Sequence, residues 1–326
     1  MKNRVKKFSI ALVAFVSFMG VAVSVLPLIG LATSGDIDTT VIDEKWGKPT
    51  FVYGGGLSDK QIKETEKLVG IDNSENVASV AVTGEDLVKY LKEGSGDTAN
   101  MISSVLVQKE NADKGVEVTI KTPENITQIT QDQYANAAIT AGVNDAKIIV
   151  ASVKKVTGES ALTGIYKAFD VNGEDLDQDR MEVAQKELET TNDIAQENAE
   201  KMDFDSAKFD QAIIEIKQEL ADLKEKQGEL ATKEDIERII NDALKNNQLE
   251  NAVTQDQINQ LMALFEKYQQ TSAIDSAQVK EQLKTLSDSV QSKFGEALQE
   301  AKDSGFLDKV GNFFSQVWNA LVGLFN

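Results

Sequence analysis

The chain has 326 residues, of which 34 are Lys or Arg and 53 are Asp or Glu, and its formal net charge is −19. It contains no cysteine and no histidine, which excludes disulfide frameworks, thiol nucleophiles, Ser-His-Asp triads and zinc sites built from His or Cys. Because so acidic a chain repels phosphate, we expect no nucleic-acid partner, whereas basic partners and cations remain open.

Residues 1–32 have the layout of an export signal. Four Lys or Arg side chains within residues 2–7 precede an uncharged apolar run over residues 8–31. Small residues at Gly30 and Ala32 predict cleavage after Ala32, which would change the net charge from −19 to −23. An uncleaved anchor is the alternative, because the run is long enough to span a bilayer. In both cases we expect the chain to be extracytoplasmic, either secreted or attached to the outer face of the cytoplasmic membrane.

The composition of the remaining chain changes near residue 175. Before this point, short β-branched runs separated by Gly and Asn alternate with amphipathic helical patterns. After it, Gly and Pro become rare, and Glu, Gln, Lys, Leu and Ile dominate. The predicted fold class is therefore α+β, with a mixed α/β domain over residues 36–175, an acidic antiparallel helical bundle over residues 176–302 and an amphipathic helix over residues 304–326.

The first of these parts is expected to contain five strands and four clear helices. The predicted strands are Thr50–Tyr53, Val77–Val82, Ile102–Gln108, Val116–Lys121 and Lys147–Val153. The predicted helices are Ser58–Val69, Thr83–Leu91, Thr130–Ala141 and Ser160–Phe169. A Gln follows Ser58, Thr130 and Thr254 at the third position, which is the pattern of a capping box and marks three helix starts.

Two apolar seams with three-four spacing predict how the later helices pack. The first comprises Phe209, Ile213, Ile216, Leu220, Leu223 and Leu230, and the second comprises Val279, Leu283, Leu286 and Val290. Neither seam reaches the three or four heptads that would indicate a free-standing coiled coil. We therefore expect antiparallel helices that pack within one chain, with the intervening Glu and Lys side chains on solvated faces.

The C-terminal segment has a broad apolar and aromatic face with very few charges. The predicted membrane or partner contacts are Phe306, Val310, Phe313, Phe314, Val317, Trp318, Leu321 and Phe325. This pattern fits the last helix of the bundle or an interfacial membrane segment, and both alternatives stay open.

Two short motifs have residues that could take part in binding or catalysis. The glycine run at residues 54–56 could present backbone donors to an anion, but a tight turn from strand to helix is favoured because the run matches neither a dinucleotide fingerprint nor a P-loop. Ser152 and Lys155 have Ser-x-x-Lys spacing, yet they follow a strand pattern instead of opening a helix, so chance is favoured. No catalytic residue is assigned.

The acidic stretch over residues 170–179 is a weak candidate metal site. Its oxygen ligands would be Asp170, Asn172, Asp175 and Asp177, which suit calcium. Gly173 does not stand at the sixth position that an EF-hand loop requires, so the end of one helix followed by an acidic helix start is the favoured interpretation. No other cofactor is predicted.

Five segments carry a resemblance to a known family. They are Tyr53–Asp72, Met101–Lys109, Gln133–Val153, Val156–Asp170 and Thr254–Glu266. Over most of residues 49–270 the chain resembles the YpuA-like secreted proteins of Gram-positive bacteria, a domain of unknown function. The resemblance implies an extracytoplasmic address, and it implies no activity, substrate or catalytic residue.

Three hypotheses for the function follow. The first is a non-enzymatic secreted or envelope protein that binds a cell-surface protein or another envelope component, with membrane contact through residues 306–325. The second is an envelope hydrolase that uses paired carboxylates, because this chemistry needs neither His nor Cys. The third is calcium-dependent surface adhesion through residues 170–179. The missing nucleophiles and histidines favour the first hypothesis.

Overall fold

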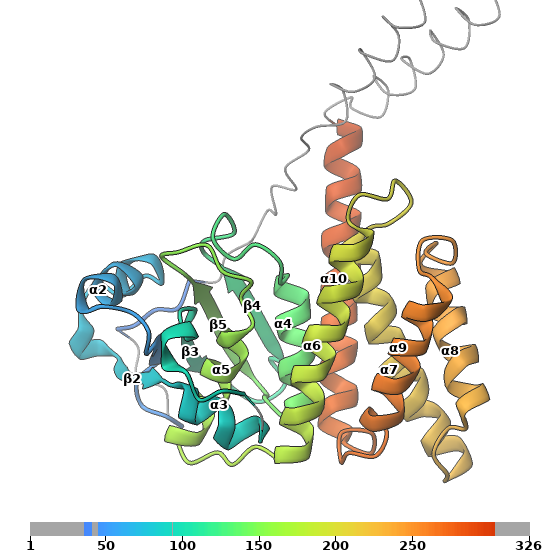
Figure 1. Ribbon diagram of the computed structural model, residues 1–326, viewed down its shortest axis with the longest axis horizontal. Coiled ribbons are helices and arrows are strands. Elements are labelled where there is room, and N and C mark those ends of the chain that lie inside the picture. The colour runs from blue at the N-terminus through green and yellow to red at the C-terminus, as the bar shows by residue number, and fades with distance from the viewer. Residues whose placement is uncertain (1–35, 41–44, 93, 304–326) are drawn as a thin grey trace, which may run out of the picture. The chain divides into compact units, whose positions relative to one another are not determined.

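The computed structural model of the protein describes residues 36–40, 45–92 and 94–303, with side chains up to residue 293 (Figure 1). The described residues all belong to one compact unit. The predicted signal over residues 1–32 and the amphipathic segment over residues 304–326 lie outside the described residues. None of the helices in the described ranges combines the length and the apolar character needed to cross a membrane.

A five-stranded mixed sheet forms the first layer. Its strands are β1 (Thr50–Gly54), β2 (Ala78–Val82), β3 (Ser104–Lys109), β4 (Val116–Ile120) and β5 (Ala146–Ala151), in the order β2-β1-β3-β5-β4. β1 and β2 are parallel, β4 and β5 are parallel, and antiparallel β3 joins the two pairs. Val105 of β3 pairs with Val52 on one side and Val150 on the other, and these three β-branched side chains are fully buried.

Helices cover both faces of this sheet. They are α2 (Asp59–Leu68), α3 (Gly84–Leu91), α4 (Gln131–Ala141) and α5 (Ser160–Val171), with short 3₁₀ turns at Ser74–Asn76 and Thr98–Asn100. α5 packs on β1 and β3, and α4 packs on β4, on the face that contributes to the main core. α2 covers part of the other face, where Ile62 and Leu68 contact a smaller cluster around Phe51 and Leu106.

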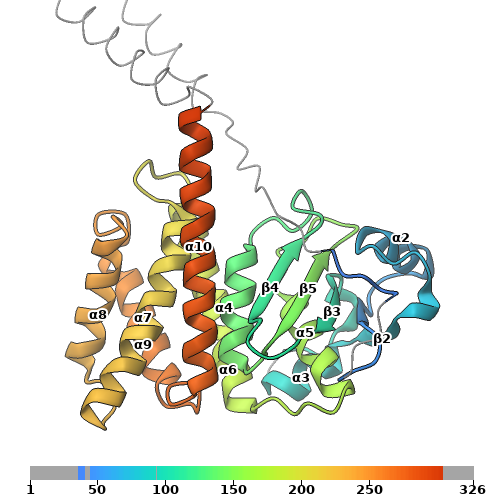
Figure 2. The ribbon, with the colours of Figure 1, turned by 180° about the vertical axis from the view of Figure 1, so that it is seen from behind.

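A helical layer continues from the covering helices. It comprises α6 (Gln178–Asn198), α7 (Ser206–Gln227), α8 (Lys233–Asn246), α9 (Gln255–Tyr268) and α10 (Ala277–Asp303). α6 packs on α4, α9 packs on α6, α8 lies against α7 and α9, and α10 lies against both α7 and α4 (Figure 2). One continuous hydrophobic core runs from the sheet through these helices. The change in composition near residue 175 therefore marks a change of secondary structure inside a single core.

The predicted elements of the first part are confirmed. Each of the five strands and four helices lies within two residues of its predicted ends. The three predicted capping boxes are also present, and the backbone N–H groups of Ser58, Thr130 and Thr254 each donate to the side-chain oxygen of the Gln three residues later. Local chemistry thus specifies where these helices begin.

The two apolar seams are confirmed except at one residue. The seam of α10 is buried from Val279 to Val290, and the α7 seam is buried from Phe209 to Leu220. Leu230 is 40% exposed, so its assignment to the first seam is wrong. α7 ends at Gln227, and Gly228 then takes a left-handed conformation with φ +75°, which stops the helical stripe before it reaches Leu230.

The glycine run at residues 54–56 forms the tight turn from β1 toward α2. The N–H of Gly55 donates to the carbonyl oxygen of Val82 at 2.8 Å, and the N–H of Gly56 donates to that of Met101 at 2.9 Å. Both backbone donors are therefore used inside the protein, and the favoured turn interpretation is confirmed.

Replacing Gly56 by Ala should destabilise the protein by about 1–3 kcal/mol, the usual cost of overpacking. A Cβ there would lie 2.6 Å from the carbonyl oxygen of Ala99, which is backbone and cannot swing aside. Gly173 provides a matched control, because it has φ +78° with open space around it. Its change to Ala should cost only about 1–2 kcal/mol of left-handed strain. Urea unfolding measures both, and a smaller loss for Gly56→Ala than for Gly173→Ala would contradict the packing argument.

Candidate functional site

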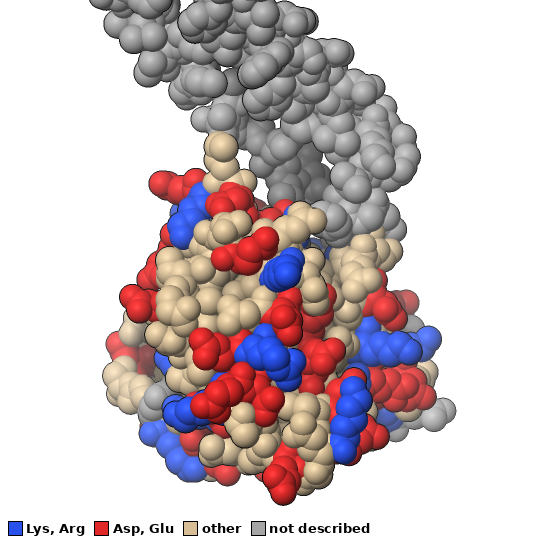
Figure 3. Space-filling view, turned by 90° about the vertical axis from the view of Figure 1, so that its right-hand side faces the viewer, with Lys and Arg blue, Asp and Glu red and all other residues tan. Residues whose placement is uncertain are grey.

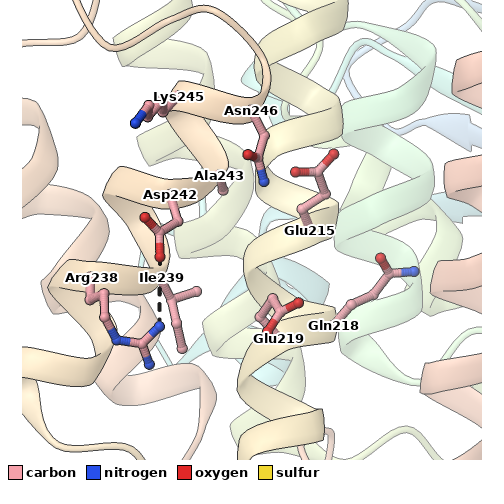
Figure 4. Close-up of a pocket in the computed structure, with 9 residues that line it drawn as sticks. All are labelled: Glu215, Gln218, Glu219, Arg238, Ile239, Asp242, Ala243, Lys245 and Asn246. Atoms are coloured by element: carbon pink, nitrogen blue, oxygen red, sulfur yellow. Dashed lines mark ion pairs between the residues drawn. The ribbon is translucent and has the colours of Figure 1, made fainter.

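A hollow of about 550 Å³ lies between α7 and α8 (Figure 4). We call it the α7–α8 groove. Its walls are Glu215, Gln218 and Glu219 on α7, and Arg238, Ile239, Asp242, Ala243, Lys245 and Asn246 on α8. Arg238 forms ion pairs with Asp242 at 3.6 Å and with Asp235 at 3.5 Å. These exposed pairs contribute little to stability, so Arg238 and Asp242 are available for a partner.

The groove forms because two amphipathic helices meet along their apolar faces. On α7, Ile213, Ile216 and Leu220 point into the core, which leaves Glu215 and Glu219 on the outer side, one turn apart. On α8, Ile239 is buried at the base of the hollow. Figure 3, which views the molecule from the side of α8 and α9, shows acidic and basic side chains interspersed over this surface. The groove is therefore a charged surface above an apolar seam.

A second set of polar residues is sealed inside the protein, where α4, α6 and α7 meet. The ammonium group of Lys217 donates to Asn136 Oδ1 at 2.6 Å, to Thr140 Oγ1 at 2.6 Å and to Glu187 Oε1 at 2.9 Å. The side chains of Lys217 and Glu187 are 0% and 3% exposed. Burial lowers the pKa of Lys217, and the Glu187 carboxylate opposes this shift.

Arg180 and Tyr268 lie next to this ion pair. The hydroxyl of Thr140 donates to Glu187 Oε2 at 2.7 Å, and Arg180 donates from Nε to the Thr140 carbonyl oxygen at 2.7 Å. The ring of Tyr268 lies 5.4 Å from the Lys217 ammonium, and burial raises the pKa of the tyrosine. Because every one of these contacts is internal, this cluster ties α4 to the helical layer and is closed to substrates.

Sequence reasoning placed the Lys and Glu side chains of the later helices on solvated faces, and this prediction is wrong for Lys217. The residue lies four positions after Ile213 and three before Leu220, so it falls on the same stripe of α7 as those apolar residues. A lysine on an apolar stripe was the available signal. Its partner on α6 could not be identified without the tertiary structure.

A buried carboxyl group connects α4 and α7. The Thr130 hydroxyl donates to Asp210 Oδ2 at 2.8 Å, and Asp210 is only 4% exposed. Burial raises the pKa of Asp210 well above its usual range, and Asp132 adds to this shift. Lys293 of α10 forms an ion pair with Asp132 at 2.9 Å. Three helices therefore meet at an acidic cluster that carries one nearby ammonium group.

The weak metal candidates have other partners in the structure. Asp170 accepts from Lys89 Nζ at 2.7 Å and from the Tyr90 hydroxyl at 2.8 Å. Asn172 donates to Thr50 Oγ1 at 2.8 Å, Asp177 accepts from the first turn of α6, and Asp175 is exposed. Among the described residues, no group of three or more Asp, Glu, His or Cys is arranged to hold a metal ion. The left-handed Gly173 confirms the predicted helix end.

Thermal unfolding in the presence and absence of calcium tests whether residues 170–179 bind the ion. At a free calcium concentration of about 100 times the Kd, binding would stabilise the protein by about 2.7 kcal/mol and so raise its melting temperature. Since Asp170 and Asn172 are held by other side chains, we expect equal melting temperatures in calcium and in chelator. A calcium-dependent increase that Asp175→Asn abolishes would contradict this expectation.

The Ser-x-x-Lys motif does not form a nucleophile site. Ser152 follows β5 directly, and its hydroxyl donates to the backbone carbonyl oxygen of Lys154 at 2.7 Å. The prediction of a strand end is therefore confirmed. The predicted contacts from Phe306 to Phe325 lie outside the described residues.

The fold and groove define a mixed α/β protein with a layer of charged helices. The chain belongs to the family described as protein of unknown function (DUF1002), whose model matches residues 53–286. It is similar to the uncharacterized protein YpuA of Bacillus subtilis (strain 168), with 32% identity over 296 residues that cover 88% of this chain and 92% of that protein. No solved structure matches the chain. The predicted resemblance to the YpuA-like family is thus confirmed.

Proposed function

We propose that the protein is a non-enzymatic binding protein of the cell envelope that works outside the cytoplasm and holds its partner in the α7–α8 groove. The observation that carries this proposal is the groove itself, where carboxylates of Glu215, Glu219 and Asp242 lie on two facing helices (Figure 4). In contrast, the buried ionisable groups Lys217 and Asp210 are enclosed by the protein. The charged side chains that a partner can reach are therefore those of the groove, and they suit recognition by charge.

The partner that fits this groove is a basic segment of an envelope protein. The groove has three carboxylates and two cationic side chains, and the whole chain carries a net charge of −19. A negative field of this kind attracts basic partners and accelerates their association, in a way that salt suppresses. We propose that the helices after residue 175 act as an acidic antiparallel bundle that presents this surface.

Charge reversal tests the groove. The Glu219→Lys/Asp242→Lys protein should bind envelopes of Bacillus subtilis roughly tenfold more weakly than the wild type, a loss of about 1.4 kcal/mol. The matched control is Asp59→Lys/Glu64→Lys, because it makes the same charge change on exposed positions of α2. Cosedimentation with washed envelopes at low salt measures the bound fraction. Equal binding of both double variants, or no binding of the wild type, would refute the groove as the contact.

We also propose that residues 306–325 contact the membrane, since the sequence there combines a wide aromatic face with few charges. Flotation with neutral and anionic liposomes should recover residues 33–326 in the lipid fraction. The same protein ended after Ser304 should stay at the bottom of the gradient. If neither form floats, the segment does not anchor the protein and the membrane part of the proposal fails.

A second candidate function is glycan hydrolysis, which the carboxylates on both walls of the groove favour. In that reaction, one carboxyl group protonates the leaving oxygen while the other acts as base or nucleophile. Glu219 and Asp242 stand on facing helices (Figure 4). Release of reducing ends from purified envelope glycan, abolished by Glu219→Gln and by Asp242→Asn, would establish the hydrolase and displace the binding proposal.

A further inference from the structure

A second hollow of about 320 Å³ lies beside the α7–α8 groove, between the start of α7, the end of α8 and α10. Five of its eight lining residues carry side-chain amides, so we call it the amide pocket. These five are Gln211, Asn246, Asn247, Gln248 and Gln291. The volume falls in the range of small-molecule sites in proteins.

One of these amides has a buried acceptor without a partner. Gln211 is 6% exposed, and its Nε2 donates to Ser287 Oγ at 2.9 Å and to Glu215 Oε1 at 3.2 Å. Its Oε1 accepts no hydrogen bond from the described residues. A buried oxygen in this state lacks the compensation that native proteins normally provide. Because Gln211 lines the pocket, a ligand that brings an N–H or O–H donor there would satisfy this oxygen.

The charged groups at the edge of the pocket form hydrogen bonds with side-chain amides. Lys208 Nζ donates to Gln248 Oε1 at 2.8 Å, and Asn247 Nδ2 donates to Glu215 Oε2 at 3.1 Å. The apolar part of the lining comes from Val290, which is 4% exposed, and from Ala207. The pocket thus offers donors, acceptors and an apolar wall, and it presents no concentrated charge to an ionic ligand.

We propose that the amide pocket binds a neutral saccharide. Each sugar hydroxyl both donates and accepts hydrogen bonds, as a side-chain amide does, so the two pair without any charge. One hydroxyl donates to Gln211 Oε1, while the C–H face of the ring packs against Val290 and Ala207. The proposal stands on this pocket alone and does not depend on the protein partner of the α7–α8 groove.

Saturation-transfer NMR tests the proposal on the full chain, purified in a detergent without a sugar headgroup. The probes are maltotriose, cellotriose and chitotriose at millimolar concentration, with a blocked alanine tripeptide as the competing class. At least one trisaccharide should receive magnetisation from the wild type. Gln211→Met, which keeps the side-chain length and removes the amide, should weaken its binding by roughly tenfold or more.

Two further variants make the outcome decisive. Ala207→Leu fills the pocket without removing a side-chain hydrogen bond, so it should abolish the magnetisation transfer to the trisaccharide. This variant keeps the test decisive if Gln211→Met does not fold. Gln260→Met is the matched control, because Gln260 is exposed on α9. Glu219→Lys/Asp242→Lys should retain saccharide binding, which separates this site from the envelope contact. Absence of transfer to all three trisaccharides, transfer that persists in Ala207→Leu, or transfer to the tripeptide alone would overturn the proposal.

Discussion

Replacing Lys217 by Met should destabilise the folded protein by about 3–5 kcal/mol, because it leaves the buried Glu187 carboxylate without its cation. The Met side chain fills nearly the same volume, so the loss reports on charge and hydrogen bonding instead of a cavity. The Asn136 side chain and the Thr140 hydroxyl also lose the donor that now lies 2.6 Å from each of them. Urea unfolding followed by circular dichroism measures the change.

A double-mutant cycle identifies the cause of this loss. Lys217→Met combined with Glu187→Gln removes both charges, and it should recover a large part of the stability because no uncompensated ion remains. The control is Lys233→Met, since Lys233 pairs with Glu266 at 3.1 Å while its own side chain is 73% exposed. That change should cost about 0–1 kcal/mol. A Lys217→Met protein as stable as the control would contradict the structural role of the pair.

Replacing Asp210 by Asn should stabilise the protein at neutral pH by about 1–3 kcal/mol, because burial penalises the charged form of this carboxyl group and the amide carries no charge. The amide has almost the same shape as the carboxyl group and can keep the hydrogen bond with Thr130. The exposed Asp222 on the same helix serves as the matched control, and its change to Asn should leave the stability unchanged.

The same carboxyl group gives the stability a pH dependence of known sign. Burial raises the folded pKa of Asp210 above the ordinary value of 3.8, so the folded protein holds this proton more tightly than the unfolded chain does. Its contribution is therefore fully present below the ordinary pKa and is lost as the pH rises through the raised folded pKa. Unfolding free energies at about pH 5 and about pH 8 should differ less for Asp210→Asn than for the wild type. An unchanged difference would refute this assignment.

Local chemistry explains why the strands and helices of the first part could be predicted so closely. The β-branched run of β5 and the capping box at Thr130 depend on residues that are neighbours in sequence. The sheet order could not be predicted in the same way, since antiparallel β3 inserts between two parallel pairs that are distant in sequence. Leu230 was misplaced because the left-handed Gly228 ends the helix before the apolar spacing does.

The candidate sites depended even more on tertiary contacts. The groove requires Glu219 of α7 to face Asp242 of α8, and no spacing within either helix indicates that they share one hollow. The amide pocket joins Gln211 to Gln291, which are 80 positions apart in the numbering. The predicted acidic stretch was visible in the sequence, yet Asp170 is held by Lys89 and Tyr90. The sequence thus showed where charged residues are concentrated along the chain, but it could not identify which of them face one another in the fold.

Because α10 packs on α4, the core around α4 cannot finish folding before α10 docks. Gln282 donates to the carbonyl oxygen of Val143 at 3.4 Å, and Lys293 reaches Asp132 across 161 positions of the chain. The surface of α4 that α10 covers therefore stays open until α10 itself is available to dock on it. Contacts of such long sequence separation slow folding and prolong the exposure of apolar surface. A chain that ends before α10 therefore leaves this surface of α4 exposed to chaperones and proteases.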